Sequence, residues 1–248
     1  MALPTLDRAL AALDAADLQA RHGRVRNLIG LVVEATGLQA QVGELCHIDA
    51  GRGRKAVPAE VVGFRDGATL LMPLGALEGI APGSAVTATG GELRIEVGDE
   101  LLGRVVDGLG HPIDGGPTFE EAVARNTAAD PPDPLTRPRI EERITLGVRA
   151  MDALIPCGRG QRLGIFAGSG VGKSSLLGMI ARSTSAQVNV IALVGERGRE
   201  VREFLERDLG DALKHSVVIV ATSDQPALVR LKAAFTATAI AEHFRDAG

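Results

Sequence analysis

The sequence predicts two domains of different class: a small antiparallel β-barrel and, after it, an α/β domain built on a parallel sheet. Three observations support this prediction. Short apolar runs separated by glycine turns fill residues 24–92, a spacing typical of small barrels. From residue 188 on, nearly all-apolar runs alternate with helical patterns, as in doubly wound sheets. A glycine-rich turn at 167–172 lies between an apolar run and a helical pattern.

The composition is that of a globular protein with an aliphatic core. The chain has 248 residues, enough for two modest domains, and 45% of them are hydrophobic while only 2% are aromatic. With neither Trp nor Tyr, it offers few platforms on which single-stranded nucleic acid could stack. The net charge of −4 gives no general attraction for nucleic acid. We therefore expect no nucleic-acid partner.

The cysteines and histidines predict neither a disulfide nor a metal site. Cys46 and Cys157 are far apart and show no C-x-x-C spacing, so we expect two buried, reduced thiols. None of the five histidines has the spacing of metal ligands. The first residues lack the basic region of a secretory signal, and no apolar run is long enough to span a membrane. We therefore expect a cytoplasmic protein.

The N-terminal segment, residues 1–23, predicts an amphipathic helix over residues 4–22. Leu6, Leu10 and Leu13 recur at helical spacing on one side of this alanine-rich stretch. Two interpretations stay open, because the helix precedes the first domain. It either packs on its own domain or docks onto a partner or a membrane surface.

Residues 24–92 are assigned to the barrel domain. Glycine pairs such as Gly90-Gly91 mark turns between the apolar runs. The basic run at residues 52–55 is interpreted as a solvated hairpin tip rather than as a binding patch. The runs expected to form strands cover residues 27–33, 44–48, 57–64, 69–72, 84–87 and 93–97.

Residues 93–248 are assigned to the α/β domain, and turn residues dominate its first part. Residues 99–117 are rich in glycine, aspartate and proline, so we expect turn structure throughout. Four prolines follow within residues 131–138. Because proline stiffens a chain, we expect an extended segment laid across the α/β domain. Residues 149–154 predict a short helix.

A phosphate-binding loop is predicted at the glycine-rich turn. The apolar run 163–166 is expected to form a strand, and a helical pattern follows Lys173. The motif is G-x-x-x-x-G-K-[ST] with alanine at its first glycine. Backbone N–H groups of such a turn point at phosphate oxygens, Lys173 adds a charge for the β/γ-phosphates, and the Ser174 hydroxyl can ligate Mg²⁺. The predicted nucleotide-binding residues are Ala167, Gly168, Ser169, Gly170, Val171, Gly172, Lys173, Ser174 and Ser175.

The alternative interpretation of this stretch is a glycine-rich turn that binds nothing. The strand–turn–helix context that the motif requires is present on both sides, and it favours a nucleotide site.

A second part of the site is predicted after the next strand. Residues 188–194 are expected to form a strand buried on both faces of a parallel sheet. Glu196 follows, at the strand end that faces the same crevice as the phosphate loop. A carboxylate there can align the water that attacks a γ-phosphate, and Arg197 could pair with it or reach the phosphate. The alternative is that Glu196 merely lies in the first turn of a solvent-facing helix.

The alternation of elements continues to the end of the chain. We expect a helix to about residue 209, a buried strand at 217–220 and a long helix at 226–246. This order predicts a doubly wound sheet with its ligand at the carboxyl ends of the strands.

Several stretches carry a family resemblance. They include GIFAGSGVGKSSLLGMIAR, GERGREVREFLE, ATSDQPALVRLKAAFTATAIAEHFRDAG, DGLGHPIDGGP and PPDPLTRPRIEERITLGVRAMDALIPCGRGQR. From about residue 24 onward the chain resembles the flagellar protein-export ATPases. These group with the ATPases of virulence-type III secretion and are related to the catalytic beta subunit of rotary ATP synthase. The loop AGSGVGKSSLLGM looks more flagellar than virulence-type.

The resemblance implies a RecA-type ATPase core that uses ATP and Mg²⁺ for the export of flagellar proteins through a type III secretion apparatus. Lys173 and Ser174 match the family's phosphate and Mg²⁺ residues, Glu196 the carboxylate that activates water, and Arg197 its catalytic neighbour. It also implies a homohexamer, a regulatory stalk-like protein bound through the N-terminal helix, export substrates and chaperones. Peripheral contact with an export gate at the inner membrane is implied as well.

The sequence departs from the family pattern at its end. The family continues with a strand bearing a Mg²⁺-coordinating aspartate, an arginine finger and a helical C-terminal domain. The chain is therefore expected to be a fragment with an incomplete sheet that hydrolyses nucleotide poorly.

Three classes of function stay open. The first is an export ATPase of the flagellar or the virulence type. The second is a nucleotide-binding subunit without turnover, although Glu196 favours an enzyme because a non-catalytic sister subunit would be expected to lack it. The third is an RNA-translocating hexamer of the Rho type, which the scarce aromatics and the acidic charge disfavour.

Overall fold

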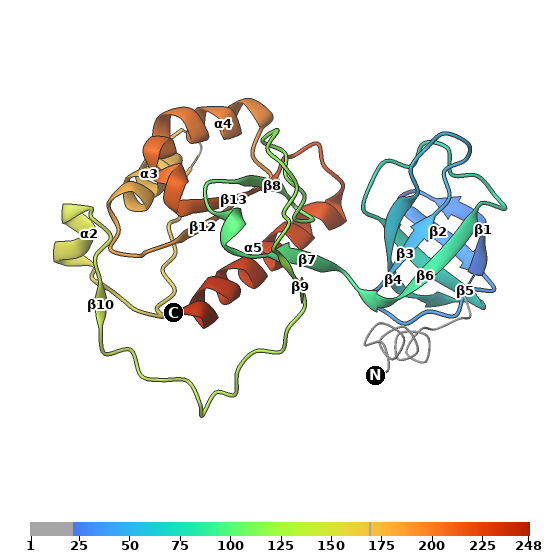
Figure 1. Cartoon of the computed structure of the whole chain (residues 1–248), viewed down its shortest axis with the longest axis horizontal. Coiled ribbons are helices and arrows are strands. Elements are labelled where there is room, and N and C mark those ends of the chain that lie inside the picture. Colours follow the sequence, from blue (N-terminus) through green and yellow to red (C-terminus); the bar gives the residue numbers. More distant parts are fainter. Residues whose placement is uncertain (1–21, 169) are drawn as a thin grey trace, which may run out of the picture. The chain divides into compact units, whose positions relative to one another are not determined.

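The computed structural model describes residues 22–168 and 170–248. The chain divides into two compact units, the first ending at Glu92 and the second beginning at Leu93 (Figure 1). The predicted N-terminal helix lies outside the described residues apart from its end. Its last residue, His22, is the only one described, and the prediction is wrong there because His22 begins a barrel strand.

The first unit is a closed barrel of six antiparallel strands, which confirms the predicted barrel. Neighbouring strands follow the order β1, β2, β5, β4, β3, β6 around the barrel (Figure 1). The strands are β1 (His22–Ile29), β2 (Val32–Thr36), β3 (Glu44–Ile48), β4 (Val57–Arg65), β5 (Ala68–Pro73) and β6 (Ala85–Glu92).

The barrel interior is aliphatic, as the composition predicts. Val33, Val61, Leu71 and Val86 are fully buried and pack against one another across the barrel. Cys46 lies among them as a free thiol, so its predicted burial is confirmed. Burial, reinforced by the nearby Glu44 carboxylate, raises the pKa of the Cys46 thiol to about 12, which keeps the thiol protonated and unreactive at neutral pH.

Two of the six predicted barrel strands are wrong. The run 27–33 is a hairpin rather than one strand, because Gly30 adopts a left-handed φ of 62° and turns the chain between β1 and β2. The run 93–97 is not a barrel strand. It forms β7 (Arg94–Val97), which pairs with β9 (Val123–Asn126) in the second unit.

The second unit contains a three-stranded parallel sheet in the order β12, β13, β8. Its strands are β8 (Val105–Asp107), β12 (Asn189–Val194) and β13 (Ser216–Ala221). The parallel sheet was predicted but β8 was not, because the turn residues around Val105-Val106 hid a short β-branched run.

Helices cover both faces of this sheet (Figure 1). Side chains of β13 alternate: Val217 and Ile219 pack with Ile240 of the C-terminal helix α5, while Val218 packs with Phe204 on the opposite face. The helices are η1 (Asp99–Leu101), α2 (Arg149–Leu154), α3 (Lys173–Ser183), α4 (Gly198–Glu203), a π-helical turn η2 (Phe204–Leu209), η3 (Gly210–His215) and α5 (Ala227–Ala247). A further two-stranded ladder pairs β10 (Arg143–Ile144) with β11 (Cys157–Gly158).

The sheet differs from prediction at the edge formed by β12. Ile191 and Leu193 are buried, but Val194 is 42% exposed, so β12 is not buried on both faces. The run 163–166 is not a strand, and Phe166 is 97% exposed. A strand needs a backbone partner, and within residues 22–168 and 170–248 no strand pairs with the free edge of β12 or with 163–166.

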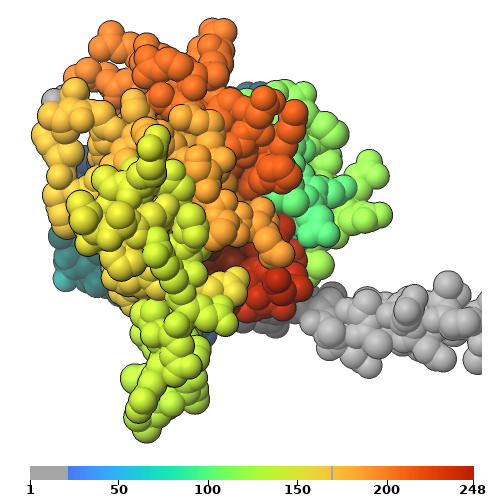
Figure 2. All heavy atoms as spheres, turned by 90° about the vertical axis from the view of Figure 1, so that its left-hand side faces the viewer, coloured from blue at the N-terminus to red at the C-terminus, as the bar shows by residue number. Residues whose placement is uncertain are grey.

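The proline-rich segment is also placed differently. Residues 128–143 are exposed throughout and arch away from the sheet instead of lying across it (Figure 1). Figure 2 shows this segment, in yellow-green, projecting from the surface. Proline keeps the chain extended, but the segment has few apolar side chains to bury, and Leu135 is 95% exposed.

In the described part of the chain, no helix combines the length and the apolarity that crossing a membrane would require.

Candidate functional site

The glycine-rich loop has the backbone conformation that its residues predict. Gly170 and Gly172 have φ angles of 76° and 92°, in the left-handed region that side chains disfavour. A Cβ atom at Gly168, Gly170 or Gly172 would meet no atom within 4 Å. The loop therefore needs glycine for its dihedral angles, and it faces open space in which phosphate oxygens could lie. Ser169 lies outside the described residues.

Helix α3 begins directly after this loop. Gly172 caps it, and the Leu176 N–H donates to the Gly172 carbonyl over 2.9 Å. Lys173 and Ser174 are thus the first two residues of an 11-residue helix. The unpaired N–H groups of its first turn give this end a partial positive charge, which favours anions.

The carboxyl end of β12 brings Glu196 to the loop. The Gly195 N–H donates to the Ala221 carbonyl over 2.7 Å, and the Ser223 N–H donates to the Glu196 carbonyl over 3.0 Å. These bonds fix the turn after β12 against the end of β13. The Lys173 Nζ then lies 3.5 Å from the Glu196 Oε1. The two side chains that the sequence singles out are therefore neighbours.

Two adjoining cavities lie beside this pair. One, of about 360 Å³, is lined by loop glycines with Lys173, Ser174, Ser175 and Glu196. The other, of about 210 Å³, shares Lys173, Ser174 and Glu196 and extends to Leu193 of β12. The loop glycines, Lys173, Ser174, Ser175 and Glu196 thus border these cavities at the carboxyl end of the sheet, whereas the predicted Ala167 and Val171 line neither of them.

Arg197 is placed differently from its neighbour. Its guanidinium lies 3.4 Å from the Glu200 carboxylate. Arg197 is not among the described residues that line the two loop cavities. Arg197 is the N-cap residue of α4, and its guanidinium pairs with Glu200 in the first turn of that helix.

Sequence reasoning missed the acidic and basic residues that close the opposite side of the larger cavity. Glu200 and Glu203 of α4 line it, together with Arg207 and Asp208 of the π-helical turn. The Arg207 guanidinium donates hydrogen bonds to the Asp208 carboxylate over 3.3 and 3.4 Å, and these bonds raise the pKa of Arg207. The ion pair of Arg207 with Asp208 keeps the guanidinium charge of Arg207 at the loop cavity.

A glycine in the middle of α3 could have indicated that this helix packs closely against the π-helical turn that carries Asp208. A Cβ at Gly178 of α3 would lie 2.6 Å from the Asp208 carbonyl oxygen, so α3 and the π-helical turn approach each other at Gly178. A glycine inside a helical pattern costs helix stability, and a close backbone approach is one reason to keep it.

The donor set fits a magnesium ion held together with a nucleotide. Ser174 supplies a hydroxyl oxygen on the cavity lined by the loop glycines, and oxygen is the ligand atom that Mg²⁺ prefers. Across the described residues, no group of three or more His, Cys, Asp or Glu side chains could hold a metal alone. Phosphate oxygens would have to complete the coordination.

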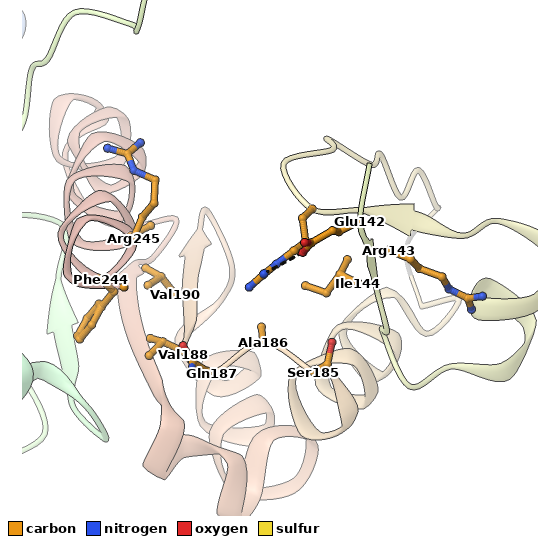
Figure 3. A pocket seen from close by; sticks show the side chains of 13 residues that line it. Glu142, Arg143, Ile144, Ser185, Ala186, Gln187, Val188, Val190, Phe244 and Arg245 are labelled. Carbon is orange, nitrogen blue, oxygen red and sulfur yellow. Dashed lines mark hydrogen bonds and ion pairs between the residues drawn. The ribbon is translucent and has the colours of Figure 1, made fainter. Parts of the chain in front are cut away.

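A larger cavity, of about 660 Å³, lies elsewhere in the second unit (Figure 3). It is lined by Ile144, Val190 and Phe244, and the Glu142–Arg159 ion pair lines it as well. The phosphate loop does not line it. We regard it as a groove beside the free edge of β12 rather than as the nucleotide site, because among the described residues no glycine of the phosphate loop and no helix N-terminus borders it.

Family comparisons agree with the two units. Residues 25–90 match the beta-barrel domain of the ATP synthase alpha/beta family. Residues 147–248 match the nucleotide-binding domain of the same family.

Curated relatives extend over nearly the whole chain. The flagellum-specific ATP synthase of Bacillus subtilis (strain 168) is 55% identical over 238 residues, which cover 95% of this chain and 54% of that protein. The type 3 secretion system ATPase of Xanthomonas euvesicatoria is 48% identical over 249 residues, covering 98% of this chain and 55% of that protein. The chain thus spans about half the length of the relatives that it matches.

Two solved structures of a type III secretion ATPase are also similar to the chain. The assembled ATPase EscN of the enteropathogenic E. coli type III secretion system aligns with a TM-score of 0.80 at 45% identity, covering 91% of this chain and 54% of that one. EscN in complex with its central stalk EscO aligns with a TM-score of 0.81 at 46% identity, covering 90% of this chain and 55% of that one. The chain therefore belongs to the ATP synthase alpha/beta family and is similar, within that family, to the flagellum-specific ATP synthases and the type 3 secretion ATPases.

Proposed function

We propose that this chain is the nucleotide-binding part of an ATPase that drives protein export through a flagellar type III secretion apparatus. The observation that carries the proposal is the pairing of Lys173 with Glu196 across a left-handed glycine loop at the carboxyl end of a parallel sheet. Phosphoryl transfer depends mainly on positioning and on charge stabilisation, and this arrangement offers both.

Each residue has a role in this proposal. Backbone N–H groups of residues 167–172 cradle the phosphates of ATP, and Lys173 neutralises charge on the β- and γ-phosphates. Mg²⁺, held by the Ser174 hydroxyl and the phosphates, would lower the charge that the attacking water meets. Glu196 orients that water and accepts its proton, and Arg197, its neighbour, stabilises the charge that develops.

Arg197 must move to take this role, because its guanidinium points at Glu200 in the present structure. The Arg197–Glu200 pair is exposed, and such pairs contribute about 1 kcal/mol or less. Breaking it therefore costs little.

Flagellar export is favoured over virulence-type export by the loop AGSGVGKSSLLGM, which looks more flagellar. The identities overlap: flagellum-specific relatives are 44–55% identical to the chain and type 3 secretion ATPases 41–48%, so the 55% of the Bacillus subtilis protein adds only modest support. The alternative of a nucleotide-binding subunit without turnover has no such support, because Glu196 borders the loop cavity where a water-orienting carboxylate is needed.

The solved relatives support an assembled state and a stalk partner for the whole protein. EscN was solved as an assembled ATPase and with a central stalk protein. We infer a homohexamer for the whole protein, a stalk-like partner, and contact between the N-terminal segment and a regulatory protein. Export substrates and their chaperones would reach this hexamer in the cytoplasm, at the inner-membrane export gate.

Nucleotide binding by the chain tests the proposal. We expect saturable binding of a fluorescent ATP analogue with Mg²⁺, and at least tenfold weaker binding after Lys173→Ala. Lys214→Ala is the matched control, because Lys214 is an exposed lysine paired with Asp211 and lies outside both loop cavities. Equal affinities for the two variants would refute the assigned site.

A further inference from the structure

We propose that Asp152 is a positioning residue for the phosphate loop. Its carboxylate organises a clasp, defined as residues 145–147 and 184–185, that holds the far end of helix α3. This inference rests on the proposed nucleotide site, because it assigns the residue that fixes the geometry of that site from a distance.

The Asp152 carboxylate uses both oxygens to shape the turn before α2. Its Oδ1 accepts the Leu146 N–H and its Oδ2 accepts the Gly147 N–H, each over 2.9 Å. The side chain is only 17% exposed, so these bonds are partly shielded from water. The Arg143 guanidinium donates to the Asp152 carbonyl and lies 3.9 Å from its Oδ1, which further fixes the residue.

The turn that Asp152 shapes lies directly against the end of α3. Gly147 has a φ of 76°, and a Cβ at this position would clash with the side chain and the carbonyl of Ser183. Ser183 is the last residue of α3. Only glycine combines this φ with such a close approach, so the Gly147 backbone itself is the contact surface.

Hydrogen bonds join the same two segments. The Thr145 carbonyl accepts the Ser185 N–H over 2.9 Å and the Thr184 hydroxyl over 3.1 Å. In return, the Thr145 N–H donates to the Ser185 hydroxyl over 3.2 Å. The clasp therefore fixes α3 by shape at Gly147 and by directed bonds at Thr145.

Helix α3 transmits this position to the phosphate loop. An 11-residue helix is about 16 Å long, and a tilt of about 10° at one end displaces the other by roughly 3 Å. The Lys173 side chain at the loop end is 53% exposed, whereas Gly178 and the clasp hold the middle and the far end. Displacements of about 1 Å already impair a preorganised site.

Asparagine at position 152 is the informative substitution. Its side chain keeps the shape of aspartate but offers one acceptor oxygen instead of two, so one of the two N–H groups loses its partner. Asp133→Asn is the matched control. The Asp133 Oδ1 accepts the Leu135 N–H over 2.7 Å in the exposed proline-rich segment, outside the clasp.

The experiment measures two properties of the 248-residue chain and its variants. The first is affinity for a fluorescent ADP analogue with Mg²⁺, and the second is hydrogen exchange of the amides of residues 176–180 without nucleotide, which are the hydrogen-bonded amides nearest the loop end of α3. We expect Asp152→Asn to weaken nucleotide binding about tenfold and to speed that exchange, while Asp133→Asn changes neither. Ser185→Ala, which removes the hydroxyl that accepts the Thr145 N–H and donates to the Thr145 carbonyl, should weaken binding two- to fourfold and serves where Asp152→Asn does not fold.

The outcomes separate this inference from the proposed function. If Asp152→Asn lowers the melting temperature but leaves both the affinity and the exchange of 176–180 unchanged, Asp152 is structural only and the inference is wrong. If the unaltered chain binds no nucleotide, the proposed function fails, and the exchange of 176–180 still decides whether Asp152 holds α3.

Discussion

The Lys173 ammonium lies 3.5 Å from the Glu196 carboxylate, and the two side chains are 53% and 30% exposed. A pair so accessible to water contributes about 1 kcal/mol or less. A phosphate group, which carries more charge and meets the loop N–H groups as well, can displace the carboxylate from the lysine. Nucleotide binding would then release Glu196 toward water while Lys173 turns to the phosphate.

This relationship gives a prediction for Glu196→Gln in the complete protein. Glutamine keeps the shape but cannot accept a proton from water, so steady-state ATP hydrolysis should fall about 100-fold or more. ADP affinity should be unchanged or a few-fold tighter, because Lys173 no longer has a competing anion. ATPase activity close to that of the unaltered protein would show that Glu196 has a different role.

The loop glycines predict a contrast between two identical substitutions. Gly172 has a φ of 92°, and alanine there is strained by about 1–2 kcal/mol. Gly172→Ala should therefore weaken nucleotide binding at least fivefold in a fluorescence titration. Gly198→Ala is the control, because Gly198 is not among the left-handed residues, its Cβ position is open and it lines neither loop cavity. Equal losses for both would mean that dihedral strain is not the reason for glycine.

The approach of α3 to the π-helical turn predicts a stability effect. Alanine at Gly178 would favour the helix by about 1 kcal/mol, but its Cβ would lie 2.6 Å from the Asp208 carbonyl oxygen. We expect the clash to win and the free energy of unfolding in urea to fall by about 1–3 kcal/mol. Gly198→Ala, with open space around its Cβ, should be neutral or stabilising. A stabilised Gly178→Ala would contradict the packing described here.

The turn after β8 predicts a pH dependence of stability. The His111 Nδ1 lies 3.2 Å from the Asp107 Oδ2, and this hydrogen bond raises the pKa of His111 despite the opposing effect of burial. Burial opposes ionisation of Asp107, but hydrogen bonds from the His111 side chain and from the His111 and Leu109 N–H groups outweigh it and lower the pKa of Asp107.

The signs follow from linkage. The contribution of His111 is complete below its unfolded pKa of about 6.5 and is lost as pH rises through the higher folded value. The contribution of Asp107 is complete above about pH 3.9 and is lost as pH falls through its lowered folded value. Because the His111 side chain is 71% exposed, we expect at most about 1 kcal/mol. Urea unfolding at pH 5.5 and 8.5 should show a larger cost of His111→Gln at pH 5.5, and an equal cost at both would exclude the ion pair as its source.

The elements that the sequence predicts well are those with strong local signals. The strand at 217–220 and the helix at 226–246 are uniformly apolar or periodic, and both are present as β13 and α5. The phosphate loop is visible because left-handed backbone requires glycine at Gly170 and Gly172.

Features that depend on partners distant in sequence were not predictable in this way. Val105-Val106 form a strand only because β13 lies beside them, and residues 163–166 do not form one because no described strand pairs with them. The clasp around Thr145 also arises from tertiary contact, which no local sequence pattern encodes. The same holds for the positions of Glu200 and Asp208 in the lining of the loop cavity.

The most direct test of the central claim is a crystal structure of the chain with ADP and Mg²⁺. The account predicts the β-phosphate within hydrogen-bond distance of N–H groups between Gly168 and Lys173, with the Lys173 Nζ on the phosphate and away from Glu196. Nucleotide bound instead in the cavity beside Val190 and Phe244, with the Lys173–Glu196 pair intact, would contradict it.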